Sequence, residues 1–210
     1  MTILRIDASI QGPRSASSEL ADLVEAEWTA ARPDETVVRR HLAAQPLPAD
    51  AWMHAIHASA TPEDQRTDEQ RSAYALAGRI AAELRTADAA ILALPLYNWG
   101  VSQHVKTWMD LAIAGSAGDG RLLDGKPTVV LTTRGGAYGP GTPRDGWDHN
   151  TAYLRRIVAD IWGADLTLVE REFTLVGVNP ALDEFAEVAA VMKKSAHEAA
   201  AEAGRTLATR

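Results

Sequence analysis

Residues 89–112 read as a strand, a turn and a helix, and they constrain the fold more than any other stretch of the chain. Residues 89–94 form an unbroken apolar run, which is typical of a parallel strand covered on both faces, and Pro95 cannot donate to a strand ladder. From Val101 the apolar residues recur at helical spacing, and Gly115 is a natural helix end. A buried strand that leads into a helix predicts an α/β protein.

The rest of the chain repeats this alternation. Further strands are expected at residues 3–8, 37–42, 127–133 and 166–173, and further helices from Ser17 and at residues 68–85, 150–162 and 181–206. Residues 43–61 are poorly periodic and predict a long irregular connection, with at most one helical turn at residues 52–57. Five strands that alternate with helices predict a doubly wound parallel sheet of order 2-1-3-4-5, with helices on both faces.

Composition limits the class of partner. The 210 residues suit one domain, and no repeat or linker divides them. The net charge of −7 argues against nucleic acid or an anionic membrane surface, since both attract clustered Lys and Arg. A small molecule is therefore the expected partner.

The sequence has no signal for cysteine chemistry, for a metal site, or for secretion or membrane insertion. The chain has no Cys, so neither a thiolate nucleophile nor a Cys-ligated metal is expected. His54 and His57 have metal-ligand spacing, but no third ligand accompanies them, and no metal site is predicted. The chain has no secretory-signal pattern and no apolar run of about 18 residues, which favours a cytoplasmic protein.

Two loops beyond the strand ends carry polar groups suited to a ligand. Ser9, Ser15, Ser17 and Ser18 place hydroxyls beside a helix N-terminus, where a phosphate monoester would bind. The alternative is that Ser17 only caps the helix, and the serines alone leave the two readings equal. Neither a P-loop nor a Gly-x-Gly-x-x-Gly pattern is present, which disfavours nucleoside triphosphates and dinucleotides.

The turn at residues 96–100 adds Tyr97, Asn98 and Trp99 at the end of the central strand. Gly135 and Gly136 follow the fourth strand and let the backbone approach a ligand, although paired glycines alone are more often an ordinary turn. Ligands of open α/β sheets bind beyond the carboxyl ends of the strands, so these loops are expected to converge on one flat, aromatic ligand.

The chain carries three motifs in order: Ser9 followed by Ser15-Ala16-Ser17, then Pro95-Leu96-Tyr97-Asn98-Trp99, then Thr133-Arg134-Gly135-Gly136. Together they resemble the FMN-dependent NADH azoreductase and quinone reductase family, which has a flavodoxin-like fold. The resemblance extends over nearly the whole chain. It implies a single FMN-binding domain over residues 1–210 and a homodimer with a flavin site at each side of the interface.

The resemblance also assigns residues. It implies that the FMN phosphate binds at Ser9, Ser15, Ala16 and Ser17. The isoalloxazine ring would lie along Leu96, Tyr97, Asn98 and Trp99, and its pyrimidine end would contact Thr133, Arg134, Gly135 and Gly136.

The chain departs from the family in one respect that concerns the substrate. Relatives bring aromatic residues, including a Tyr, on the loop after the central helix, whereas residues 116–121 have none. Trp162 and residues 138–147 are the candidates to fill that space.

The resemblance implies that NADH or NADPH passes hydride to FMN and leaves, after which a quinone, azo or nitroaromatic acceptor takes two electrons in a ping-pong cycle. Asn98, through nearby backbone N–H groups, and Tyr138, as a proton source, are the catalytic candidates. Two alternatives remain open: a flavodoxin-like electron carrier without turnover of its own, and a biosynthetic flavin reductase specialised for one polycyclic quinone.

Overall fold

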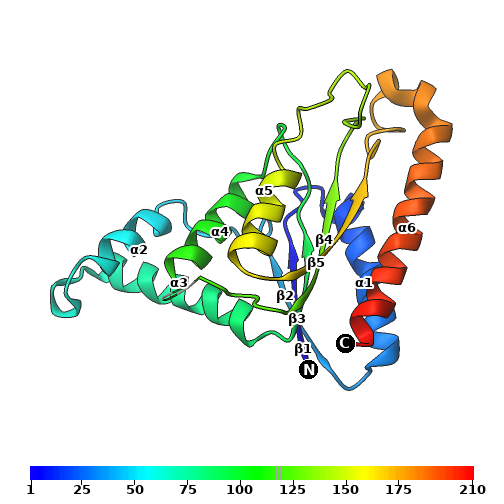
Figure 1. Ribbon diagram of the computed structural model, residues 1–210. Helices are drawn as coiled ribbons and strands as arrows, with labels where there is room; N and C mark the ends of the chain where they lie inside the picture. Colours follow the sequence, from blue (N-terminus) through cyan, green and yellow to red (C-terminus); the bar gives the residue numbers. More distant parts are fainter. Residues whose placement is uncertain (117, 119) are drawn as a thin grey trace.

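The computed structural model describes residues 1–116, 118 and 120–210, and its strands form one parallel sheet of order β2-β1-β3-β4-β5. The predicted sheet order is confirmed. Because all strands are parallel, their carboxyl ends meet at one edge, and the chain termini lie at the opposite end of the molecule (Figure 1). The strands are β1 (Thr2–Asp7), β2 (Thr36–His41), β3 (Ala89–Ala93), β4 (Pro127–Thr133) and β5 (Asp165–Arg171).

Helices cover both faces of the sheet, as the alternation predicts. One face carries α1 (Ala16–Ala31) and α6 (Ala186–Ala208), which pack against each other (Figure 1). The other face carries α2 (Ala51–Ser59), α3 (Asp68–Thr86), α4 (Gln103–Ala114) and α5 (Thr151–Arg155), and α5 continues as a π-helical segment, Arg156–Ile161. Short 3₁₀ turns occur at Gly12–Arg14, Glu63–Gln65 and Pro180–Phe185.

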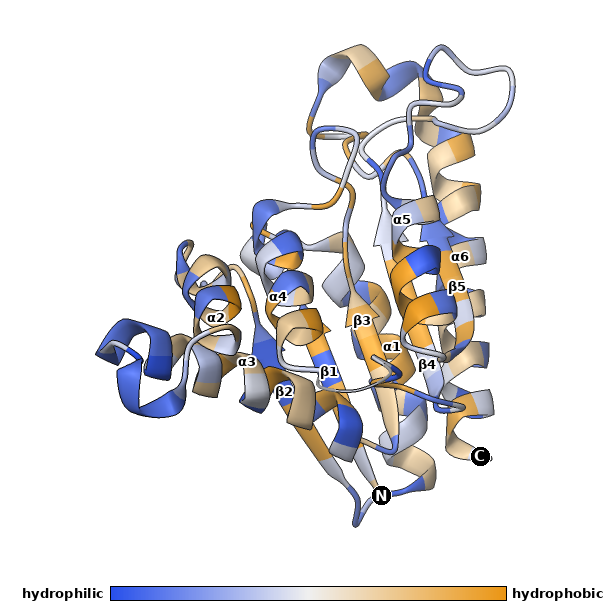
Figure 2. Ribbon diagram, turned by 60° about the vertical axis from the view of Figure 1, so that its left-hand side comes forward, coloured by the Kyte–Doolittle hydropathy of each residue, from blue (hydrophilic) through white to orange (hydrophobic). Residues whose placement is uncertain are grey.

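The central position of β3 in the sheet explains why its sequence does not alternate between apolar and polar residues. Ala90 and Leu92 belong to the core beneath α3 and α4, whereas Ala89, Ile91 and Ala93 belong to the core beneath α1 and α6. Since both faces are covered, every residue of β3 is buried, and Figure 2 shows the strand as hydrophobic along its length.

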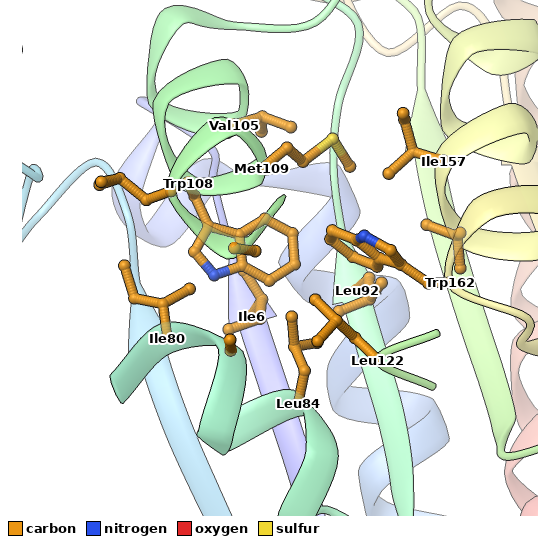
Figure 3. Close-up of a cluster of buried hydrophobic side chains, with 14 of the residues drawn as sticks. Ile6, Ile80, Leu84, Leu92, Val105, Trp108, Met109, Leu122, Ile157 and Trp162 are labelled. Atoms are coloured by element: carbon orange, nitrogen blue, oxygen red, sulfur yellow. The ribbon is translucent and has the colours of Figure 1, made fainter. Parts of the chain in front are cut away.

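Two tryptophans form the centre of the larger core. Trp108 of α4 and Trp162, just after the π-helical segment, are both fully buried, with ring centroids 5.4 Å apart in an edge-to-face arrangement (Figure 3). Such pairs stabilise a core beyond the area that they bury. Trp162 is therefore a core residue, and the expectation that it fills space at the ligand site is wrong.

The connection at residues 43–61 contains the helix α2 rather than one turn. Ala51, Ala55 and Ala58 face the core, whereas the large apolar Trp52 and Ile56 are about half exposed. The buried stripe consists of alanines, so the strongly hydrophobic residues mark the wrong face and the helical period is hidden.

Several element ends also differ from the expected ones. The helix after β3 begins at Gln103, because the Ser102 side chain accepts the N–H of Val105. The last segment begins as a 3₁₀ turn after Asn179, and regular α6 starts only at Ala186. Gly115 does end α4 as expected. The glycine-rich residues 115–125, which follow α4 and which the sequence predicts to be a mobile loop, include positions 117 and 119, which lie outside the described residues.

Within the described part of the chain, no helix is long and apolar enough to cross a membrane.

Candidate functional site

The carboxyl edge of the sheet contains a cavity of about 410 Å³, within the size range of small-ligand sites. It is enclosed by the loops after β1, β3, β4 and β5; we call it the main cavity. Its lining includes the predicted site residues Ser9, Ala16, Leu96, Tyr97, Asn98, Thr133, Gly135 and Tyr138. The structure therefore brings together residues from all three sequence motifs.

Tyr97 joins the first two loops. Its hydroxyl lies 3.1 Å from Ser9 Oγ and accepts the main-chain N–H of Ile10, also at 3.1 Å. Ser9 Oγ in turn accepts the N–H of Gln11. These bonds hold the loop after β1 against the turn after β3 at the main cavity.

Ser15, and not Ser17, is the N-cap of α1. Ser15 Oγ accepts the N–H of Ser18 at 3.0 Å, whereas Ser17 lies inside the first turn, is buried and hydrogen-bonds Ser15 Oγ at 3.2 Å. The predicted cap is wrong because the 3₁₀ turn with Pro13 directs the chain into the helix two residues earlier. The N–H groups of Ala16 and Ser17 have no helical acceptor and are available to an anion.

The turn after β3 is tight and strained. Tyr97 and Gly100 exchange two main-chain hydrogen bonds of 3.0 Å, and the two residues between them, Asn98 and Trp99, have φ of 46° and 66°. Such primed turns prefer Asn and Gly, so an indole in the left-handed region is unusual. Backbone strain of this kind is typical of ligand-contacting segments. Trp99 is 47% exposed.

The loop after β4 is fixed by its neighbours. Thr133 accepts the N–H of Leu96 through its carbonyl, which joins this strand end to the turn after β3. A Cβ at Gly135 would lie 2.6 Å from the Leu175 side chain, and one at Gly136 would lie 2.8 Å from the guanidinium of Arg144. Both contacts are with the ends of flexible side chains, so a larger residue at either position would require Leu175 or Arg144 to move.

Arg134 is largely buried and paired with three carboxylates from two segments. Its Nε donates to Asp148 at 2.7 Å and its guanidinium donates to Thr151 at 2.8 Å; Glu170 and Glu172 of the β5 end complete the ion pairs. Burial alone would lower the pKa of Arg134, but the hydrogen bond that it donates to Glu170 and the charge of Asp148 outweigh it and raise this pKa. The guanidinium thus joins both ends of the loop at residues 134–148. The predicted contact of Arg134 with a pyrimidine ring stays untested.

The main cavity also contains residues that the motifs do not predict. Arg14 and Arg144 add positive charge, and Thr174, Leu175 and Val178 come from the loop after β5. Arg14 stands between the serines of the first loop, so its position in the sequence was a usable signal. The loop after β5 has no comparable pattern, because its place at the cavity depends on the sheet order.

Residues 138–147 do lie at the site, in contrast to Trp162. Tyr138 lines the main cavity beside Arg144, and Trp147 packs edge-on against Trp99 with ring centroids 6.1 Å apart. The loop after α4, where the resemblance implied aromatic residues in relatives, includes positions 117 and 119, outside the described residues. Among the described residues there is no cluster of three metal-ligating side chains.

Comparison with known proteins identifies the family. A family model described as a flavodoxin-like fold matches residues 1–198. An FMN-dependent NADH:quinone oxidoreductase of Frankia casuarinae is 36% identical over 206 residues, 96% of each chain. The chain belongs to the flavodoxin-like family that contains these oxidoreductases. The predicted resemblance and the predicted fold are thereby confirmed.

Other relatives agree with this assignment. An FMN-dependent NADH:quinone oxidoreductase of Streptomyces avermitilis is 34% identical over 216 residues, covering 100% of this chain and 98% of its own. Among solved structures, an azoreductase of Bacillus anthracis superposes with a TM-score of 0.79 at 21% identity, covering 98% of this chain and 99% of its own. At that identity the likeness concerns the fold.

Proposed function

We propose that this protein is an FMN-dependent NADH:quinone oxidoreductase that also reduces azo or nitroaromatic compounds. The main cavity is the observation that carries the proposal, because residues of all three motifs line it. Its size suits a mononucleotide, and its chemistry is that of an anion site beside an aromatic turn. The names of the curated relatives, which specify FMN, NADH and quinone, support the same cofactor, donor and acceptor.

The proposed FMN contacts divide into three groups. Ser9, Ser15, Arg14 and the N–H groups of Ala16 and Ser17 bind the phosphate. The turn from Leu96 to Trp99 lies along the isoalloxazine, and the Thr133–Gly136 segment contacts its pyrimidine end. Bound FMN would supply two-electron redox chemistry, in a ping-pong cycle of hydride transfer from NADH and then to the acceptor. N–H groups near Asn98 stabilise negative charge, and Tyr138, which lines the cavity, is the proposed proton source.

Turnover of the purified protein tests the function. We expect steady NADH oxidation with quinones and azo dyes, and acid release of the bound chromophore should yield FMN. A purified protein whose bound FMN is not reduced by NADH would instead be an electron carrier. Reduction of the FMN by NADH without turnover on any quinone or azo dye would favour a biosynthetic enzyme specialised for one polycyclic quinone. Release of FAD would contradict the phosphate assignment, since the first loop offers one phosphate site.

Replacement of Ser15 by alanine tests the phosphate site. Loss of the N-cap alone should lower the free energy of unfolding by about 1 kcal/mol. A lost hydrogen bond to a charged phosphate should in addition weaken FMN by roughly 10- to 150-fold, corresponding to about 1.5–3 kcal/mol. Riboflavin, which lacks the phosphate, should lose little affinity. Fluorescence quenching measures both dissociation constants.

Thr67→Ala is the matched control for this experiment. The Thr67 side chain caps α3 as part of a capping box, and Thr67 does not line the main cavity. Its loss should lower stability by a similar amount and leave FMN affinity unchanged. Equal weakening of FMN and riboflavin in Ser15→Ala would show that the first loop does not bind the phosphate.

We also propose a homodimer in the cytoplasm. About half of the side-chain surface of Trp52 and much of Met53 and Ile56 on α2 is exposed, which is apolar surface suited to a second copy. The cytoplasm is where NADH, the proposed donor, is formed and used. Light scattering at micromolar concentration should give twice the mass of one chain, and a monomer would contradict the proposal.

A further inference from the structure

The main cavity carries positive charge in a chain whose net charge is −7. Arg14 and Arg144 line it, and no carboxylate is among its lining residues. Arg134 is paired with three carboxylates, whereas neither Arg14 nor Arg144 forms an ion pair with any described residue. An arginine side chain stays charged near neutral pH, so both cations can act on whatever occupies the cavity.

The two cations belong to different loops. Arg14 lies in the 3₁₀ turn directly before Ser15, in the loop after β1. Arg144 lies in the loop after β4, where a guanidinium nitrogen comes within 2.8 Å of the position that a Cβ at Gly136 would occupy. The same guanidinium lies over the Tyr138 ring, with its Cζ 5.5 Å from the ring centroid. One cation is therefore placed with the serines, and the other with the paired glycines.

The main chain around Arg144 is folded into turns that fix the base of its side chain. The N–H of Asp145 donates to the carbonyl of Thr142 at 3.1 Å, and the N–H of Trp147 donates to the carbonyl of Arg144 at 3.0 Å. The Asp145 carboxylate accepts the N–H of Gly141 at 3.2 Å and forms no ion pair with the neighbouring guanidinium. The positive charge of Arg144 thus stays uncompensated beside the cavity.

A cation shifts a redox equilibrium only if it interacts differently with the two redox states. The phosphate of FMN is the same in both states, so a cation beside it stabilises both equally. Hydride from NADH brings two electrons and one hydrogen to the neutral ring and leaves NAD⁺, and the resulting negative charge is concentrated at the pyrimidine end of the ring. A cation at that end stabilises the reduced state selectively.

We propose that Arg144 raises the reduction potential of bound FMN by stabilising the negative charge of its reduced form, whereas Arg14 acts on the phosphate alone. The proposal rests on the proposed oxidoreductase function, in which residues 133–136 contact the pyrimidine end. It divides the two cations of the main cavity between two tasks, since Arg14 contributes to binding and Arg144 to the redox equilibrium.

Reduction of the FMN-loaded protein in equilibrium with a reference dye measures the potential. Arg144→Gln should lower the ratio of the affinities for reduced and oxidised FMN by roughly tenfold, the lower end for a hydrogen bond to a charged group, because Arg144 is exposed. For a two-electron couple this ratio corresponds to a potential about 30 mV lower. Arg144→Lys keeps the charge and should retain most of the wild-type potential.

Arg14→Gln is the matched control, because it removes the same charge from the same cavity. It should weaken oxidised and reduced FMN by the same factor and leave the potential unchanged. Arg156→Gln removes an exposed arginine that does not line the cavity, and it should change neither the affinity nor the potential.

An unchanged potential in Arg144→Gln would overturn the proposal. An equal drop in Arg144→Lys would also overturn it, because the charge would then not be the cause, and so would an equal drop in Arg14→Gln. A wild type whose bound FMN is not reduced by NADH would contradict the oxidoreductase function alone, since the dye titration needs no NADH. A wild type that binds no FMN would overturn both.

Discussion

Replacing Arg134 with methionine is expected to lower the free energy of unfolding by about 3–5 kcal/mol, as removal of one partner from a buried ion pair does. The Asp148 and Glu172 side chains are only 15% and 14% exposed, so the substitution leaves two poorly solvated carboxylates without their cation. Urea unfolding measures the change. Arg156→Met, which removes an exposed pair with Asp160, is the control and should cost less than about 1 kcal/mol.

A double variant tests whether Arg134 acts as a clamp on this loop. Arg134 joins the two ends of the loop that carries Tyr138 and Trp147, so its loss should weaken FMN and riboflavin alike, whether the guanidinium orders the loop or contacts the isoalloxazine ring that both ligands share. The double variant Arg134→Met with Asp148→Asn should recover part of the lost stability, because it removes one uncompensated charge. Additive losses in the double variant would contradict the clamp.

Lowering the pH is expected to lower the free energy of unfolding through the Asp148 carboxylate. Burial alone would raise the pKa of Asp148, but hydrogen bonds from the N–H and hydroxyl of Thr151 and the charge of Arg134 lower it below its ordinary value. The carboxylate therefore contributes stability that is fully present above the unfolded pKa and is lost as pH falls through the folded pKa. Asp148→Asn should have a flatter acid limb than the wild type in unfolding measured against pH.

Replacing Trp108 with alanine should lower the free energy of unfolding by about 3–5 kcal/mol, because it opens a cavity among fully buried side chains and removes the ring pair with Trp162. Trp108→Phe should cost less. It keeps an aromatic ring and removes the indole N–H, which is buried without a hydrogen-bond partner among the described residues.

Trp52→Ala provides the comparison for the Trp108 variants. Trp52 is 48% exposed, so its loss from the isolated chain should cost little. Thermal unfolding of the three variants at one protein concentration checks the order. A Trp108→Ala protein as stable as Trp52→Ala would show that the core beneath α4 is loosely packed.

The sheet order followed from the sequence because strong local signals agreed with it. The unbroken apolar run of β3 is the pattern of a strand buried on both faces, and alternation with helices leaves few parallel topologies. The same logic placed Ser9, Tyr97 and Thr133 at one edge, since parallel strands share the direction of their carboxyl ends. In the structure all three residues line the main cavity, as predicted.

Features that depend on contacts between distant residues could be determined only from the tertiary structure. The buried face of α2 consists of alanines, so hydrophobic periodicity could not reveal it. Ser15 caps α1 because of the preceding 3₁₀ turn, and Trp162 is buried because Trp108 lies across from it. The main-chain N–H of His149 bonds the carbonyl of Trp99, 50 positions earlier in the sequence, and no local pattern encodes such a contact.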